Sequence, residues 1–471
     1  MWDFRQYGDN TAIIADDATQ LTYVDLIKVI EDMGNAVYGR CLVFCLCRNE
    51  AGAVAGYAAF IENKVVPVLL NAGMDRELLD NFLNIYRPSY LWVPSDMEDI
   101  FEGFGAVYCA YGYSLLKNQI EPDYELNPEL CLLLTTSGST GSPKLVRQSY
   151  KNVSSNARAI VEYLELSCDE RPITTLPMNY TYGLSIINSH FMVGATLLVT
   201  ENGLMQKGFW NFFKEQGATS FGGVPYTYEM LDKLRFYRMD LPSLRYITQA
   251  GGKLTPRLHE KFAEYAQDKG IKFFVMYGQC EATARMGYLP ADKAVKKCGS
   301  MGIAIPGGHF MLIDDKGREI NEPDITGELV YEGDNVTLGY AECTDDLIKG
   351  DERNGVLYTG DMARFDKDGY YYIVGRRKRF LKIYGNRVNL DEIDRMIKSH
   401  FDGIEAACSG VDDHLTIFLT NEKLAEEVKA YVVDKTGLNS VAFNTFILNE
   451  IPKNDSGKTL YRELEKYLEL N

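Results

Sequence analysis

The chain has 471 residues, 46% of them hydrophobic and 24% charged, with a formal net charge of −17 and a sequence pI near 4.9. This length exceeds what one hydrophobic core usually serves, so we expect two or more domains. The acidic balance argues against a general nucleic-acid binder, which needs a basic surface, and it predicts no attraction to an anionic membrane surface.

The N-terminal residues lack the charged and then apolar pattern of a secretion signal, and no apolar run approaches the ~20 residues that cross a bilayer. The ten cysteines stand singly along the chain. Cys41, Cys45 and Cys47 fall in an apolar run that predicts a buried strand, and no cysteine or histidine group has zinc spacing. The sequence therefore predicts a cytoplasmic protein with reduced thiols and no membrane span.

Short apolar runs alternate with amphipathic stretches of helix length between about residues 40 and 280. The predicted strands include residues 65–70, 131–136, 195–200, 219–224, 245–250 and 272–277. The predicted helices include residues 152–164, 226–236 and 256–269. This alternation indicates an α/β protein whose parallel sheets are covered by helices on both faces.

The pattern changes after residue 300, where glycines separate short strand-like runs and predict a small antiparallel β subdomain. A second change follows Gly375, where four basic residues precede a segment typical of a small α+β domain. We predict a large domain at residues 1–377 and a small, mobile domain at 378–471, with a hinge near Lys378. A solvated basic turn is the alternative interpretation of the basic residues.

A loop rich in glycine and hydroxyl side chains, TTSGSTGSPK at residues 135–144, directly follows a predicted strand. Its hydroxyls and backbone N–H groups can surround an anion whose charge Lys144 offsets. The residue order fits neither a Walker loop nor a nucleophile elbow, and flexible linkers rarely follow a buried strand. The sequence therefore predicts a phosphate-binding loop, whose residues are Thr136, Ser137, Gly138, Ser139, Thr140, Gly141 and Lys144.

This loop resembles the signature of the adenylate-forming superfamily, which comprises acyl-CoA synthetases, nonribosomal peptide adenylation domains and luciferases. Two further motifs of that superfamily follow, AGGK at residues 250–253 and YGQCE at residues 277–281. The resemblance implies that Glu281 binds Mg²⁺ and that both segments contact the nucleotide, through Gly251, Gly252, Tyr277, Gly278, Gln279 and Cys280. Cys280 stands where the motif usually has threonine.

Three later segments also resemble motifs of the superfamily. YTGD at residues 358–361 implies that Asp361 binds the ribose hydroxyls, with help from Arg376. IPKNDSGK at residues 451–458 implies that Lys458 bridges the acid's carboxylate and the α-phosphate. KIYG at residues 382–385 resembles the loop that lines the pantetheine channel.

The implied first step is attack of a carboxylate oxygen on the α-phosphorus of ATP. Both reactants are anions, so the catalytic groups are cations held in advance: Mg²⁺ on Glu281, together with Lys144 and Lys458. A general base is not required because the acid is already ionised at neutral pH. The five histidines can therefore be ordinary structural residues; they are His190, His259, His309, His400 and His414.

The acyl pocket is predicted less sharply. By the resemblance, Tyr180 lies at the gate of the acid site, and Leu176 replaces the aspartate that binds an α-ammonium group, which disfavours an α-amino acid. By the same resemblance, the pocket-lining positions hold Ala250, Met276, Ala284 and Arg285. If Arg285 points inward it needs an anionic or polar partner, and an outward position on the rim is the alternative.

The sequence therefore predicts an AMP-forming ligase that uses ATP and Mg²⁺ to activate a small carboxylic acid. The implied acceptor is a thiol, either CoA or the phosphopantetheine of an acyl or peptidyl carrier protein. The basic run at residues 376–379 either meets phosphates of that acceptor or is merely solvated. Two alternatives stay open: an adenylate donor to a non-thiol acceptor, and a non-catalytic nucleotide-binding regulator marked by Cys280.

Overall fold

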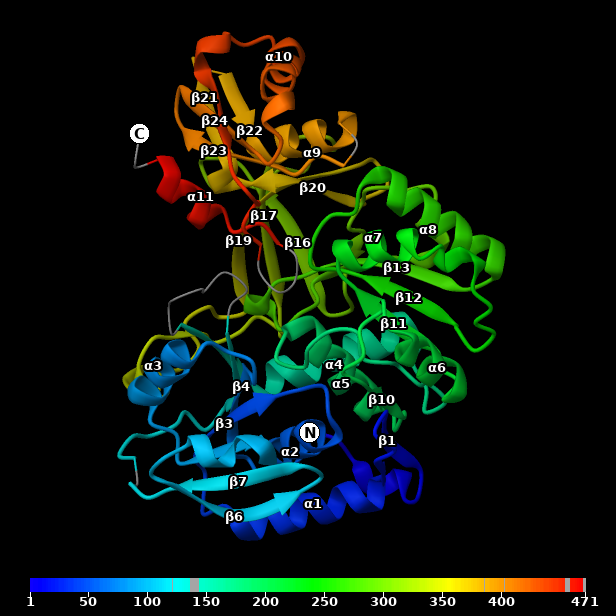
Figure 1. Cartoon of the computed structure of the whole chain (residues 1–471), viewed down its shortest axis with the longest axis vertical. Coiled ribbons are helices and arrows are strands. Elements are labelled where there is room, and N and C mark those ends of the chain that lie inside the picture. Colours follow the sequence, from blue (N-terminus) through cyan, green and yellow to red (C-terminus); the bar gives the residue numbers. More distant parts are fainter. Residues whose placement is uncertain (121, 136–143, 385, 402, 454–457, 469–471) are drawn as a thin grey trace. The chain divides into compact units, whose positions relative to one another are not determined.

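The computed structural model describes residues 1–120, 122–135, 144–384, 386–401, 403–453 and 458–468. The chain divides into two compact units (Figure 1). The first comprises Met1–Phe310 and Tyr331–Leu357, and the second comprises Met311–Val330 and Tyr358–Asn471. Residues 358–377 thus belong to the second unit, upstream of the boundary expected from the sequence, and the position of a hinge stays a prediction.

An eight-stranded sheet in the order β18-β9-β8-β4-β3-β5-β7-β6 forms the base of the first unit. Its strands are β3 (Leu42–Cys47), β4 (Val66–Asn71), β5 (Tyr90–Pro94), β6 (Phe104–Ala110), β7 (Tyr113–Asn118), β8 (Leu130–Thr135), β9 (Leu145–Ser149) and β18 (Gly339–Ala341). The central strands β8, β4, β3 and β5 run parallel, as predicted, whereas the strands outside them pair antiparallel. Every residue of β3 is buried, so Cys45 and Cys47 are core residues, whereas Cys41 precedes the strand and is half-buried.

A five-stranded sheet in the order β11-β12-β13-β14-β15 forms a second layer. Its strands are β11 (Ser220–Gly223), β12 (Tyr246–Gln249), β13 (Lys272–Tyr277), β14 (Gly287–Leu289) and β15 (Ile303–Ala304). The first three are parallel and are covered by α7 (Pro225–Lys233) and α8 (Pro256–Lys269), as Figure 1 shows. Both helices begin with proline, which favours a first helical position, and α8 ends at Gly270 in the left-handed region.

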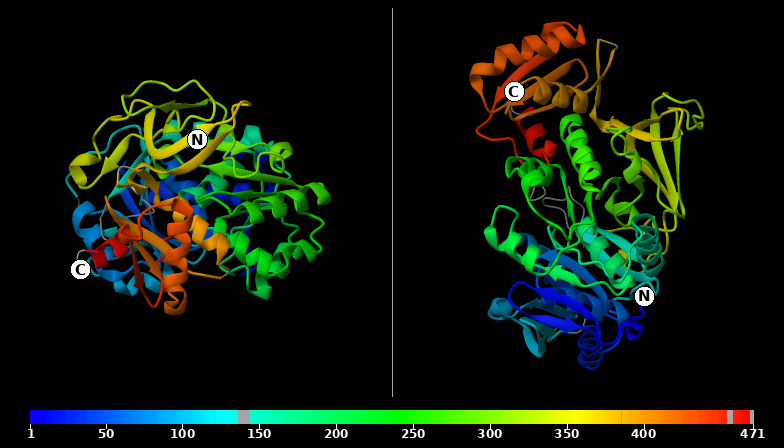
Figure 2. Two further views of the ribbon diagram at one scale, coloured as in Figure 1. Left: turned by 90° about the horizontal axis from the view of Figure 1, so that it is seen from above. Right: turned by 90° about the vertical axis from the view of Figure 1, so that its right-hand side faces the viewer.

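Two helices, α4 (Tyr150–Leu164) and α5 (Thr181–Met192), lie between these two sheets (Figure 2). One side of the pair contributes Val153 and Ile187 to the core of the eight-stranded sheet. The other side contributes Tyr163 and Tyr182 to a cluster with residues of the five-stranded sheet. Both helices are therefore buried on two sides, and polar side chains on them face a largely dry interior.

The first unit also contains a small sheet and further helices. They are the three-stranded sheet of β10 (Leu197–Val199), β1 (Thr11–Ala15) and β2 (Gln20–Thr22), and the helices α1 (Tyr23–Ala36), α2 (Ala51–Glu62), α3 (Arg76–Tyr86) and α6 (Lys207–Glu215). None of the helices within the described ranges has both the length and the apolar character needed to cross a bilayer.

The second unit carries most of a four-stranded sheet and a small α+β core. The sheet has the order β16-β17-β19-β20, with β16 (Gly308–Ile313), β17 (Gly327–Gly333), β19 (Val356–Phe365) and β20 (Tyr371–Arg376). The α+β core contains β21 (Phe380–Ile383), β22 (Asn386–Asn389), β23 (Ala406–Val411), β24 (His414–Leu419), β25 (Phe443–Ile447), α9 (Leu390–His400), α10 (Ala425–Thr436) and α11 (Tyr461–Leu468). Its own hydrophobic cluster includes Ile397, Ile417 and Val428, all fully buried.

Candidate active site

The YGQCE segment forms a tight turn at the end of β13. A Cβ atom on Gly278 would lie 1.5 Å from the carbonyl oxygen of Ala284, so only glycine fits where the returning chain passes. Ala284 itself has φ of 83°, and the N–H of Met286 donates to the carbonyl of Tyr277 at 2.9 Å, which closes the turn. Residues 279–283 therefore lie beyond the end of β13, in the connection to its neighbour β14.

The predicted nucleotide-contacting side chains lie on this turn. Tyr277 is half-buried, and its hydroxyl accepts a hydrogen bond of 3.2 Å from Nε2 of Gln279. Cys280 is 7% exposed, so its side chain belongs to the interior and not to the surface. The half-buried Glu281 follows directly, and its carbonyl accepts hydrogen bonds of 3.0 Å from the backbone N–H and the hydroxyl of Thr337.

Tyr340, on β18, joins the two predicted catalytic side chains of the first unit. Its hydroxyl donates to the carboxylate of Glu281 at 2.7 Å. The ammonium of Lys144 lies 3.8 Å from the centroid of the Tyr340 ring, and it also pairs with Glu342 at 3.4 Å. The guanidinium of Arg353 lies 4.6 Å from the same ring. A carboxylate and two cations are thus gathered around one phenol that the sequence analysis did not identify.

The electrostatics of this cluster keep the phenol protonated. Burial is the largest effect that raises the pKa of Tyr340, and the negative charge of Glu281 raises it further. The hydroxyl can therefore act only as a hydrogen-bond donor to Glu281 near neutral pH. This fixes one carboxylate oxygen and leaves the other available.

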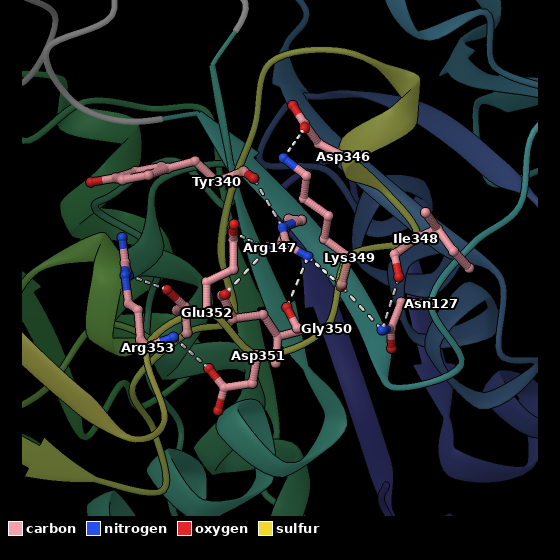
Figure 3. Close-up of polar contacts among 12 residues, drawn as sticks. Asn127, Arg147, Tyr340, Asp346, Ile348, Lys349, Gly350, Asp351, Glu352 and Arg353 are labelled. Carbon is pink, nitrogen blue, oxygen red and sulfur yellow. Dashed lines mark hydrogen bonds and ion pairs between the residues drawn. The ribbon is translucent and has the colours of Figure 1, made fainter.

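Arg147, on β9, anchors the strand that carries Tyr340 (Figure 3). Its side chain is fully buried and donates to the carbonyl oxygens of Leu338, at 3.2 Å, and Tyr340, at 3.0 Å. It also bonds the carbonyls of Lys349 and Gly350 and pairs with Glu352 at 2.5 Å. This single guanidinium thus ties β9 to β18 and to the loop that follows β18.

Glu281 is the predicted ligand of Mg²⁺ in this cluster. Within the described ranges, no group of three or more His, Cys, Asp or Glu side chains is arranged to hold a metal ion. Mg²⁺ is commonly bound by one or two carboxylates together with substrate phosphates, and Glu281 offers one such carboxylate. The residues therefore fit an ion that binds together with a nucleotide and not one held by the protein alone.

The predicted glycine turn follows β12 and lies against the predicted gate residue. Gly251 has φ of 80°, and a Cβ there would lie 2.8 Å from the hydroxyl oxygen of Tyr180. Nε2 of Gln249 donates to the carbonyls of Ala250, at 3.1 Å, and Gly252, at 2.7 Å, which holds the turn in shape. Tyr180, Ala250 and the glycine turn are therefore brought together as the resemblance implies.

Arg285 points inward and is 2% exposed, so its alternative position on the rim is wrong. Its guanidinium donates to the hydroxyls of Tyr163, at 2.9 Å, and Ser185, at 3.1 Å. It contacts the sulfur of Met276 at 2.8 Å and lies 4.7 Å from the ring centroid of Tyr182. Met276 and Arg285 therefore share one interior cluster, beside the side chains of α4 and α5.

The second unit holds the other predicted residues. Asp361 and Arg376 are Cα partners on β19 and β20, and Nε of Arg376 lies 3.6 Å from the carboxylate of the buried Asp361. Lys458 is half-buried, and two residues later the N–H of Leu460 donates to the carbonyl of Pro452 at 2.8 Å. The phosphate-loop residues Thr136, Ser137, Gly138, Ser139, Thr140 and Gly141 lie outside the described residues.

The basic run at residues 376–379 is not one uniform surface patch. Arg379 is only 7% exposed and pairs with Asp391 at 2.7 Å and with Asp394 at 2.6 Å. Its guanidinium also lies 3.6 Å from the ring centroid of Tyr461, at the start of α11. Arg379 therefore neither contacts a phosphate of the acceptor nor lies in a solvated turn, because its side chain is buried in ion pairs inside the second unit.

The buried histidines have structural partners. Nε2 of His190 lies 2.9 Å from the hydroxyl of Tyr246, and Nδ1 lies 2.8 Å from the carbonyl of Ile186. Burial lowers the pKa of His190 to about 4, so the ring is neutral near pH 7. Nε2 of His259 lies 3.0 Å from the carbonyl of Ala294. Neither histidine contacts the Glu281 cluster, in keeping with a reaction that needs no general base.

The sequence of the chain is similar to that of known enzymes. The profile of the AMP-binding enzyme family matches residues 2–341. The 2-succinylbenzoate–CoA ligase of Bacillus mycoides is 28% identical over 491 aligned positions, which cover 98% of this chain and 96% of that enzyme. The oxalate–CoA ligase of Arabidopsis thaliana is 29% identical over 353 positions, covering 69% of this chain and 65% of that enzyme. Both relatives are named as acid–CoA ligases, the enzyme class that the motifs predict.

Solved structures share the fold. The o-succinylbenzoate CoA synthetase of Bacillus subtilis, with its acyl-adenylate intermediate, matches with a TM-score of 0.79 at 22% identity over 98% of this chain and 97% of that one. MatB of Rhodopseudomonas palustris, with ATP bound, matches with a TM-score of 0.77 at 20% identity over 99% of each chain. The α/β fold class predicted from the sequence is confirmed. The chain belongs to the AMP-binding enzyme family, as its adenylate-forming motifs predict.

Proposed function

We propose that this chain is an AMP-forming ligase that activates a small carboxylic acid with ATP and transfers the acyl group to CoA. The observation that carries the proposal is the Glu281–Tyr340–Lys144 cluster, which holds one carboxylate and one cation around a shared phenol. The named relatives add support, because they couple acids to CoA. The Bacillus subtilis relative was also solved with ATP and magnesium.

The reaction has two steps. A carboxylate oxygen of the acid attacks the α-phosphorus of ATP, and the bond to pyrophosphate breaks. The thiol of CoA then attacks the acyl carbon, AMP leaves, and the thiol proton is released. The protein's main task in the first step is to offset negative charge that gathers on phosphate oxygens.

Lys144, Lys458 and Glu281 carry that task in the proposal. The two ammonium groups stabilise the charge on the phosphate and carboxylate oxygens. Glu281 would hold Mg²⁺ together with the nucleotide's phosphates, and the ion would supply further positive charge there. Tyr340 holds the Glu281 carboxylate in one orientation through its 2.7 Å hydrogen bond. The carboxylate would therefore need little reorganisation to bind the ion.

Nucleotide and acid contacts complete the proposed site. Asp361 and Arg376 bind the ribose, and the acid lies against Tyr180, Ala250 and Met276. The phosphate loop and the adenine-contacting residues are Thr136, Ser137, Gly138, Ser139, Thr140, Gly141, Gly251, Gly252, Tyr277, Gly278, Gln279 and Cys280. The contact between Tyr180 and the glycine turn, where a Cβ on Gly251 would lie 2.8 Å from the phenol oxygen, supports this arrangement.

The small C-terminal domain at residues 378–471 is proposed to be mobile, with a hinge near Lys378. A separate hydrophobic core in this part of the chain supports its independence. CoA is the proposed acceptor, and a carrier-protein phosphopantetheine is the alternative to be tested against it. A cytoplasmic location is proposed because all ten cysteines are free, as they are in a reducing compartment.

Acid-dependent exchange of pyrophosphate into ATP tests the first step. We expect exchange with at least one acid from a panel, and we expect Glu281→Gln to lower it by roughly 100-fold or more, since the variant removes a charged ligand. Glu332→Gln is the matched control, because Glu332 is an exposed carboxylate on β17 outside the cluster. Equal exchange in the two variants, or none with any acid in the native protein, would refute the proposal.

A further inference from the structure

Three arginines are buried within the described part of the chain, and they differ in their partners. Arg147 pairs with Glu352, and Arg379 pairs with Asp391 and Asp394. Arg285 is as deeply buried, at 2% exposure, yet it forms no ion pair with any described residue. Burying a cation without a counter-charge costs free energy, so the neighbours of Arg285 determine how far that cost is offset.

The neighbours of Arg285 are all uncharged. Its Nε and Nη1 atoms donate to the hydroxyls of Ser185 and Tyr163, and Nη1 also meets the sulfur of Met276. The face of Tyr182 lies 4.7 Å away and offers a cation–π contact. No described residue accepts a hydrogen bond from Nη2. These groups solvate the cation but do not neutralise it, and one donor nitrogen remains unused.

Arg285 also lies next to the proposed acid site. The glycine turn meets Tyr180, whose ring is 6.4 Å from the ring of Tyr182, and Tyr182 in turn faces Arg285. Met276, proposed to line the acid site, touches the guanidinium directly. A continuous series of contacts therefore connects the turn beside the reacting end of the acid to the unpaired cation.

We infer that Arg285 is a specificity-determining residue that binds a second carboxylate on the acid, so that the substrate is a dicarboxylic acid. The inference rests on the proposed function. A carboxylate accepts from Nη2 and supplies the missing counter-charge, and charge-assisted hydrogen bonds of this kind are the strong ones. A monocarboxylic acid of the same shape leaves the cation unpaired when it fills the site and excludes water, so it is discriminated against.

The test compares acids that differ only in the second carboxylate: succinate with butyrate, glutarate with valerate, and phthalate with benzoate. The readout is kcat/KM for pyrophosphate exchange. In the native protein we expect the preferred diacid to exceed its monoacid partner roughly 10- to 100-fold, as for one charged hydrogen bond. In Arg285→Met we expect this ratio to fall to near one, mainly through a higher KM for the diacid. Arg285→Lys should retain part of the ratio, because the charge remains.

Arg257→Met is the control, since it removes a surface arginine that pairs with Asp232 and should leave the ratio unchanged. Thermal unfolding checks that each variant is folded. A native ratio at or below one for every pair overturns the inference while the proposed function stands. An equal loss for diacid and monoacid in Arg285→Met and Arg285→Lys also overturns it, because Arg285 would then be structural. No exchange with any acid refutes the proposed function, and the inference falls with it.

Discussion

At the scale of single residues, Tyr340 connects two predicted catalytic side chains that lie far apart in the sequence. It lies 59 positions from Glu281 in the sequence, yet its hydroxyl touches that carboxylate and its ring touches Lys144. A tyrosine after a glycine carries no signal of such a role, which is why sequence reasoning missed it. Lys144 and Glu281 were identified because each stands in a motif whose residue order is itself informative.

Tyr340→Phe separates the two contacts of this residue. The ring stays over Lys144, but Glu281 loses a hydrogen bond to a charged group, commonly about 1.5–3 kcal/mol. We expect exchange at limiting Mg²⁺ to fall roughly tenfold or more, and the protection that Mg²⁺ with ATP gives against thermal unfolding to weaken. Tyr331→Phe, which removes a phenol bonded to Asn335, is the control. An unchanged Mg²⁺ dependence in Tyr340→Phe would contradict the positioning role.

His190 gives a pH dependence of stability. Burial lowers its folded pKa to about 4, from 6.5 when exposed, so the unfolded chain binds more protons between these values. This contribution is present above pH 6.5 and is lost as the pH falls towards 4. We expect the free energy of unfolding to drop by about 2 kcal/mol between pH 7 and pH 5 on account of His190. Urea titrations at several pH values should show that the unfolding free energy of His190→Gln changes less with pH than that of the native protein. An identical pH dependence would refute this assignment.

At the scale of elements, the edge of the eight-stranded sheet is held by side chains as much as by strand pairing. β18 is only three residues long, and Arg147 on β9 bonds the carbonyl of Tyr340 within it (Figure 3) and the carbonyl of Leu338 just before it. The same guanidinium reaches the loop at Lys349 and Gly350. This fixed edge carries Tyr340 towards the Glu281 turn.

Arg147→Met should therefore lower the free energy of unfolding much more than Glu352→Gln does. Removing Arg147 takes a buried charged donor away from four carbonyl groups and one carboxylate, so we expect a loss of about 3 kcal/mol or more in unfolding free energy. Glu352 is half-exposed, and its loss should cost about 1 kcal/mol or less. Urea denaturation of both variants measures the difference. Similar losses would show that the ion pair, and not the carbonyl contacts, holds the edge.

The parallel core was predictable from the sequence, and the sheet edges were not. Buried parallel strands are apolar throughout, so runs such as residues 65–70 and 272–277 identify them directly. β14 and β18 are three residues long and find antiparallel partners through the tertiary fold, which leaves little local signal. The environment of Arg379 could not be predicted either. A run of basic residues gives no indication that its last member is buried and paired with two aspartates.

At the scale of the whole molecule, each compact unit has its own core and its own share of the predicted site residues. Motif order predicted these residues because each motif is local, and the family is confirmed by the match over residues 2–341. The acid could not be predicted, because the side chains proposed to surround it come from α4, α5 and β13 and meet only in the folded chain.

The role of the second unit is tested through Lys458. We expect Lys458→Ala to lower pyrophosphate exchange by roughly 100-fold or more, since a cation placed for the transition state is lost, while ATP binding changes little. Lys466→Ala is the control, because this exposed lysine on α11 pairs with Glu463 on the same helix. Equilibrium ATP titration separates binding from chemistry. Native exchange in Lys458→Ala would remove that residue from the mechanism.

The central claim is that the acid is activated by cleavage of ATP to AMP. The most direct measurement incubates the native protein with the preferred acid, ATP, Mg²⁺ and CoA, and quantifies every nucleotide and phosphate product. The account predicts one AMP and one pyrophosphate for each acyl-CoA formed, with no reaction when the acid is left out. Formation of ADP and inorganic phosphate instead, or acyl transfer without loss of ATP, would contradict it.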